Sequence, residues 1–200
     1  MGWSSSWIAI QGRPKDEILG HLKLVETGED VYPGSKSTDF SVKEFPGDWV
    51  VLFSESFDWA DAVRTLELSN LGLVIACQFE DKVAMTSTAR AAKDGVELWS
   101  VFHDHEQSVY RLDISGEPPA CLAAIRDQHF GQQEADGGED AGVDYVHDVP
   151  FELAQTVCGY RHDEDDSLFV GLRPSRDEYS SDRSAKPNLF NRLFGRRPDG

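Results

Sequence analysis

The sequence is poor in cysteine and lacks the spacings that cysteine chemistry requires. Its three cysteines, Cys77, Cys121 and Cys158, lie 44 and 37 residues apart. Disulfide frameworks use even numbers of cysteines and zinc sites use close C-x-x-C pairs, so neither is indicated. Unpaired thiols that act as small apolar side chains are typical of a reducing compartment. We therefore expect a cytoplasmic protein.

Basic side chains are also scarce. Nineteen Lys and Arg face 36 Asp and Glu, a formal net charge of −17. This charge repels a phosphate backbone, and nucleic-acid affinity comes mostly from cations that displace counterions, so we expect no nucleic-acid partner. No run of 18 apolar residues is present to span a bilayer. The segment Met1–Trp7 lacks the basic and apolar regions of a secretory signal.

The motifs of the common enzyme classes are missing. The chain contains no G-x-S-x-G elbow, no phosphate-binding G-x-x-x-x-G-K-[ST] loop and no G-x-G-x-x-G. The acidic segment from Asp136 fails the calcium-loop template, because Ala141 occupies position 6 and His147 position 12. No cofactor is predicted, and the balance favours a protein that is not an enzyme.

Hydrophobic residues make up 40% of the chain, which is enough for a core. Apolar runs predict strands at 7–10, 49–53 and 73–79, with a weaker one at 83–88. After the turn dipeptide Asp94-Gly95, two alternating runs predict a hairpin. In the first run the apolar face is Val96, Leu98, Ser100 and Phe102, in the second Tyr110, Leu112 and Ile114, and residues 104–108 join them.

Four helices are predicted from 3.6-residue periodicity and end signals. They begin at Pro14, at a capping Asp58, at Pro118-Pro119 and at Asp148, and the last ends at Gly159. Residues 26–48 and 132–144 are expected to be loops. This order predicts an α+β fold with a mostly antiparallel sheet and helices packed on one face. We expect one domain at 1–172, a disordered linker at 173–187 and a basic amphipathic tail at 188–200.

Several motifs in residues 7–165 resemble those of a group of stand-alone bacterial proteins of similar length that carry no assigned activity. They are Trp7-x-Ala9-x-x-Gly12, Leu98-Trp99-Ser100-Val101-x-His103-Asp104, Gly116-Glu117-Pro118-Pro119, Phe151-Glu152-Leu153-Ala154-Gln155 and Gly159-Tyr160-Arg161-His162-Asp163-Glu164-Asp165. By class alone, an acidic α+β protein of this size also resembles the immunity proteins of bacterial toxin systems. The resemblance implies no chemistry.

Negative charge concentrates in two segments. Between Arg126 and Asp148 there are seven acids and one Arg, and 161–166 adds four acids. A field of this kind steers a basic partner, although it also serves solubility. We therefore predict a non-catalytic module that binds a basic protein partner, in the manner of an immunity protein, through these residues: Asp136, Glu139, Asp140, Asp144, Tyr145, Asp163, Glu164, Asp165, Asp166 and an exposed Trp99.

The run His103-Asp104-His105-Glu106 carries a second hypothesis. On a strand, His103 and His105 point to the same face, and Asp104 and His162 complete a candidate ligand set for a metal-dependent hydrolase. The alternative is that this run is only a polar hairpin tip.

The C-terminal tail carries a third hypothesis. Leu189, Phe190, Leu193 and Phe194 share one helical face, which resembles the membrane-targeting helix of the Min-system cell-division ATPase. Burying them yields about 6–12 kcal/mol, against about 8–16 kcal/mol for ordering the segment. Stable anchoring by the tail alone is not expected, which leaves weak or oligomer-assisted membrane-surface contact, docking in a partner's groove, or a frayed or self-docked terminus. In the first two cases the chain would be a peripheral membrane or scaffold protein.

Overall fold

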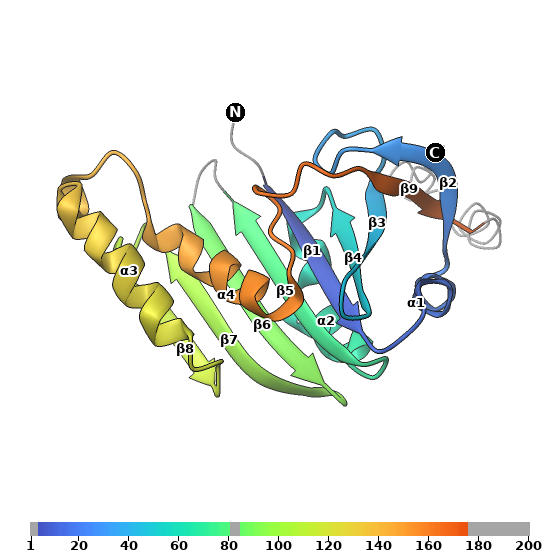
Figure 1. Ribbon diagram of the computed structural model, residues 1–200, viewed down its shortest axis with the longest axis horizontal. Helices are drawn as coiled ribbons and strands as arrows, with labels where there is room; N and C mark the ends of the chain where they lie inside the picture. The colour runs from blue at the N-terminus through green and yellow to red at the C-terminus, as the bar shows by residue number, and fades with distance from the viewer. Residues whose placement is uncertain (1–3, 81–84, 176–200) are drawn as a thin grey trace, which may run out of the picture.

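The computed structural model describes residues 4–80 and 85–175. Within these ranges nine strands form one antiparallel sheet in the order β2-β9-β3-β4-β1-β5-β6-β7-β8 (Figure 1). The strands are β1 (Ser4–Gln11), β2 (Leu24–Val31), β3 (Phe40–Phe45), β4 (Trp49–Ser54), β5 (Leu73–Glu80), β6 (Thr86–Lys93), β7 (Val96–Asp104), β8 (Leu112–Gly116) and β9 (Phe169–Pro174). The predicted α+β class with an antiparallel sheet is confirmed.

The central strands are apolar on both faces, as their continuous hydrophobic runs predict. In β1, Trp7 and Ala9 belong to one core, while Ile8 and Ile10 belong to the other. β1 pairs with β4 on one side and with β5 on the other. Because side chains alternate across a strand, the sheet separates two hydrophobic cores.

The first core lies beneath α3 (Leu122–Ala135) and α4 (Val149–Cys158), which cover strands β5 to β8 in Figure 1. Pro150 lies in the first turn of α4, where its missing N–H costs no hydrogen bond. Gly159 ends the helix with a φ of 76°, a left-handed conformation that favours glycine. The predicted bounds of α4 are therefore confirmed to within one residue.

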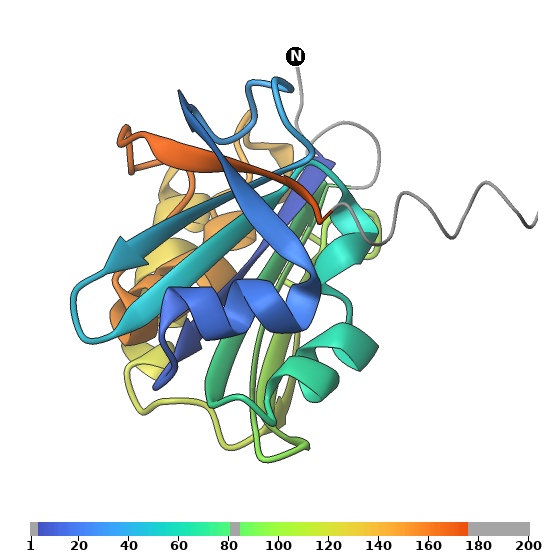
Figure 2. The same cartoon turned by 90° about the vertical axis from the view of Figure 1, so that its right-hand side faces the viewer.

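The second core is covered by α1 (Lys15–Leu22), the 3-10 helix η1 (Phe57–Ala60) and α2 (Ala62–Leu68), so helices lie on both sides of the sheet (Figure 2). The expected helix from Asp58 is interrupted. Asp61 is the actual N-cap of α2, because its carboxylate accepts the Arg64 N–H at 2.8 Å. Thr65 and Leu68 face the core, whereas Val63 is exposed.

The expected loop at 26–48 is wrong, because this segment contains most of β2 and all of β3. The Gly, Ser and acidic residues of this segment are typical of a loop. β2 can nevertheless contain such residues, because it is an edge strand whose side chains are largely exposed. The expected loop at 132–144 begins late, since α3 continues to Ala135 and a 3-10 helix occupies Gly138–Asp140. Arg173, placed in the linker by the sequence, is in β9.

The hairpin of β6 and β7 turns at Asp94 and Gly95, whose φ values of 52° and 77° are those of the expected tight turn. The predicted pairing of β7 with β8 is confirmed. The inward face of β7 is the opposite of the expected one: Trp99, Val101 and His103 are buried, while Val96 and Leu98 are exposed.

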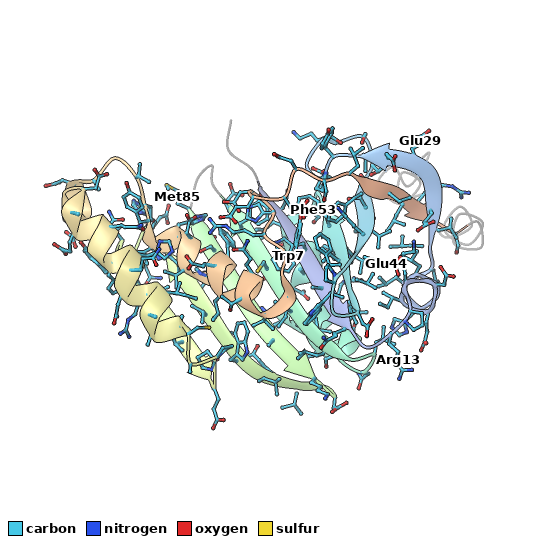
Figure 3. The ribbon with its side chains drawn as sticks, in the orientation of Figure 1. Trp7, Arg13, Glu29, Glu44, Phe53 and Met85 are labelled. Atoms are coloured by element: carbon cyan, nitrogen blue, oxygen red, sulfur yellow. The ribbon has the colours of Figure 1, made fainter. Side chains whose placement is uncertain are left out.

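Figure 3 shows how the molecule is laid out along the sheet. Trp7 and Phe53 lie over the middle strands, and Met85 lies at the end covered by α3 and α4. Glu29, Glu44 and Arg13 lie at the opposite end, around β2, β3 and α1. The candidate ligand run of β7 belongs to the Met85 end, since the Met85 carbonyl accepts the His105 N–H at 3.3 Å.

Candidate functional site

His103 is the buried centre of the site. It is the penultimate residue of β7, pairs with Ser87 and Leu112 in the neighbouring strands, and has no exposed surface. Its Nδ1 lies 2.8 Å from the carbonyl oxygen of Arg111. A carbonyl only accepts, so Nδ1 carries the proton and the Nε2 atom faces the other way.

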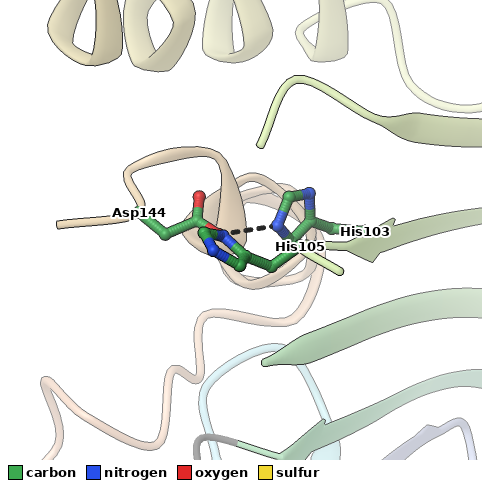
Figure 4. Close-up of side chains that lie close together, drawn as sticks. All are labelled: His103, His105 and Asp144. Atoms are coloured by element: carbon green, nitrogen blue, oxygen red, sulfur yellow. Dashed lines mark hydrogen bonds and ion pairs between the residues drawn. The ribbon is translucent and has the colours of Figure 1, made fainter. Parts of the chain in front are cut away.

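Asp144 is the group that Nε2 faces. Its Oδ2 lies 2.8 Å from His103 Nε2 and 2.8 Å from His105 Nδ1 (Figure 4). Its Oδ1 accepts the backbone N–H groups of Val146 and His147, both at 3.1 Å. Asp144 comes from the connection between α3 and α4, and His105 directly follows β7. Three ligand-type side chains from two distant segments thus meet around one carboxylate oxygen.

The electrostatics of Asp144 follow from these contacts. Burial by itself raises the pKa of a carboxyl group, but the hydrogen bonds and charge of His103, together with His105 and the His147 N–H, bring the pKa of Asp144 below its ordinary value. The carboxylate is therefore ionised at neutral pH although its side chain is 2% exposed. The His105 side chain is 42% exposed, so the cluster reaches the surface on that side.

Asp104 and His162 are outside this cluster, so the structure corrects the predicted ligand set. Asp104 points to the other face of β7 and accepts from the Gln107 side chain. His162 stacks on Phe79 with ring centroids 3.8 Å apart and packs edge-on against Phe151. Its burial lowers its pKa to about 4, so His162 is a neutral core side chain at neutral pH.

The residues predicted to contact a partner divide into exposed and buried groups. Trp99 is only 4% exposed, so the expectation of an exposed aromatic there is wrong. Asp144 is buried by the histidines, and Tyr145 is half-buried. Asp165 is half-buried and accepts the Ser167 N–H at 2.8 Å. The remaining predicted acids are exposed: Asp136, Glu139, Asp140, Asp163, Glu164 and Asp166.

Arg161 was not singled out by the sequence, yet it organises one of the acidic segments. Its side chain is 8% exposed and lies between Asp163, at 2.7 and 2.9 Å, and Asp148, at 3.1 Å. Burial opposes the charge, but these carboxylates raise the pKa of the guanidinium above its ordinary value. The sequence could have indicated this ion-pair role, because Arg161 is the one basic Lys or Arg residue beside the four acids at 163–166. The contact brings the loop after α4 against the start of that helix.

No family model, curated protein or solved structure matches this chain. None of the helices in the described residues has the length and hydropathy needed to cross a bilayer. The predicted tail, with Leu189, Phe190, Leu193 and Phe194, lies outside the described residues.

Proposed function

We propose that the chain is a protein-binding module whose acidic surface recruits a basic protein partner, in the manner of an immunity protein. The observation that carries this proposal is that every Lys or Arg side chain between residues 94 and 166 is already paired with an acid. Only Arg111, Arg126 and Arg161 lie in this stretch, and each is already paired with acids of its own chain. The acids in these ion pairs are Asp113, Asp127, Asp148, Asp163 and Glu164. The negative field of the two segments therefore comes from their other exposed acids, among them Asp136, Glu139, Asp140 and Asp166.

One ion pair links the two acidic segments. Arg161, in segment 161–166 after α4, pairs with Asp148, the last residue of the segment that runs from Arg126 to Asp148. Apolar contact area is available in the first segment, where Val143 is 54% exposed, and just after the second, where Leu168 is 44% exposed. These side chains replace Trp99 as the anchors of the proposed interface, since hot spots combine apolar burial with a charged rim.

Cysteine chemistry supports a cytoplasmic location as part of this proposal. All three cysteines are free, and Cys77 and Cys158 are buried. Burial raises the pKa of the Cys158 thiol to about 11, so this group stays protonated and unreactive at neutral pH. Unpaired structural thiols suit a reducing compartment.

The test is capture of a partner by the full chain, followed by association kinetics at low and moderate salt. A variant that neutralises Asp136, Glu139 and Asp140 with the corresponding amides should slow association and flatten its salt dependence. The matched control neutralises three exposed acids in β2 or directly before β3, near the other end of the sheet: Glu29, Asp30 and Asp39. Failure to capture a partner, or an association rate that ignores salt, would overturn the proposal.

Two other functions stay predictions. The hydrolase hypothesis keeps His103 and His105 but loses Asp104 and His162 from its ligand set. The peripheral membrane hypothesis rests on the tail beyond the described residues. Liposome flotation of chains with and without residues 188–200 tests the latter, and equal behaviour of both chains would contradict it.

A further inference from the structure

We propose that His103, His105 and Asp144 form a binding site for one divalent transition-metal cation such as Zn²⁺ or Co²⁺. The three ligand atoms, one from each residue, all lie within 4.8 Å of one another. This site is independent of the acidic surface proposed above, because its carboxylate is buried and contributes no exposed charge.

Hydrogen bonding prepares His103 to act as a ligand. Because the Arg111 carbonyl accepts from Nδ1, Nε2 is the ring nitrogen that faces Asp144, and its lone pair points at the site once a cation displaces its proton. Metal-binding histidines are usually fixed in this way, by a backbone carbonyl or a carboxylate on the second ring nitrogen. The tautomer that binding requires is therefore the one that the fold already holds.

Hydrogen bonds also orient Asp144 to act as a ligand. Two backbone N–H groups occupy Oδ1, which orients the carboxylate and leaves Oδ2 directed at both imidazoles. Each ring nitrogen that faces Oδ2 at 2.8 Å must carry a proton or bind a cation, because a bare nitrogen lone pair and the carboxylate repel each other. A single cation would replace both protons and satisfy all three ligands together.

The spacing is close to that of a coordinated ion. With metal–ligand bonds of 2.0–2.1 Å, the ligand atoms of a tetrahedral site are about 3.3 Å apart. The two nitrogen–oxygen distances of 2.8 Å must open by about 0.5 Å, and the two ring nitrogens, which lie within 4.8 Å of each other, must take up a similar spacing. The half-exposed His105 ring can rotate to allow both changes. Water from the exposed side then completes the coordination.

The ligand set also selects the kind of ion. Two imidazoles and one carboxylate suit Zn²⁺ and Co²⁺, whereas Mg²⁺ prefers an all-oxygen, near-octahedral site. The ion would link the end of β7 to the connection between α3 and α4, where His147 is held by a 2.7 Å hydrogen bond from Ser87 to its carbonyl. Binding should therefore stabilise this end of the fold.

The test uses the full chain, purified without a polyhistidine tag and stripped with a chelator. Co²⁺ titration should give one equivalent of binding with the visible absorption of a tetrahedral site, and Zn²⁺ but not Mg²⁺ should abolish that absorption. His105→Ala removes a ligand at the surface, so it should fold and lose affinity at least about tenfold. His21→Ala, which removes an exposed histidine of α1, should bind like the original chain.

A second variant separates binding from folding. Asp144→Asn retains the oxygen that accepts the Val146 and His147 N–H groups but loses the charge, so Zn²⁺ should no longer raise its unfolding temperature. The proposal is overturned if Co²⁺ gives no stoichiometric absorption, if His105→Ala binds as tightly as the original chain, or if His21→Ala loses as much affinity as His105→Ala. Partner capture is measured without added metal, so either proposal can fail alone.

Discussion

The Nη2 atom of Arg161 lies 3.1 Å from Oδ2 of Asp148, across the length of α4 in sequence. This ion pair holds the loop that follows α4 against the start of the helix. Asp163 completes it with a bidentate contact, the strongest geometry for a guanidinium and a carboxylate. A surface rich in acids thus contains one buried cation that holds two of its segments together.

Replacing Arg161 should therefore destabilise the protein. Arg161→Met keeps the length of the side chain but removes the charge and leaves Asp148 and Asp163 without their partner. Both carboxylates are about 40% exposed, so water compensates part of the loss, and we expect about 2 kcal/mol in the free energy of unfolding. Arg126→Met, which breaks only the exposed pair with Asp127, should cost less than about 0.5 kcal/mol. Equal urea midpoints for the two variants would contradict this.

Acid should destabilise the fold through His162. Its pKa is about 4 in the folded chain and about 6.5 when unfolded, so the unfolded chain binds more protons between these values. The contribution of His162 to stability is complete above pH 6.5 and falls by about 3 kcal/mol as the pH drops through 4. His162→Phe keeps the stacking on Phe79 and should lose this part of the pH dependence in urea unfolding. Parallel curves for the two proteins from pH 7 to 4 would exclude it.

The contact between α3 and α4 contains one charged hydrogen bond. His129 Nε2 lies 2.7 Å from Oε2 of Glu152, and His129 is 5% exposed. Glu152→Ala leaves that nitrogen buried without its partner and should cost about 1–3 kcal/mol in thermal unfolding. Glu152→Gln keeps an acceptor at the same place and should lose less. A Gln variant as unstable as the Ala variant would show that charge, and not hydrogen bonding, decides the contact.

Two glycines should respond oppositely to the same substitution. A Cβ added at Gly131, on the exposed face of α3, meets nothing within 4 Å. Gly131→Ala should therefore stabilise the protein by about 1 kcal/mol through helix propensity. A Cβ at Gly72 would lie 2.0 Å from the carbonyl oxygen of Gln11, so Gly72→Ala must displace β1 or β5 and should lower the unfolding temperature. Calorimetry of both variants checks the signs.

The sequence predicted those strands and helices whose own residues contain an apolar run or a residue typical of a helix end. The strands around Trp7, Val51 and Ile75 and the helix that ends at Gly159 were found because apolar runs and end residues are local properties. β2 was missed because an edge strand needs little apolar sequence when β9, far along the chain, supplies its hydrogen bonds. β3 was missed although it lies inside the sheet, because one of its two neighbours is the same distant strand β9. The inward face of β7 was inverted because both of its faces contain large apolar residues.

The candidate site divides in the same way. Sequence alone placed His103 and His105 two residues apart at the end of a strand and concentrated negative charge in the second half of the chain. Only the tertiary structure decided that Asp144, 39 residues from His105, is their buried partner and not a surface acid. Spacing along a strand fixes which side chains share a face, whereas the approach of a distant loop depends on how the whole sheet and its helices pack.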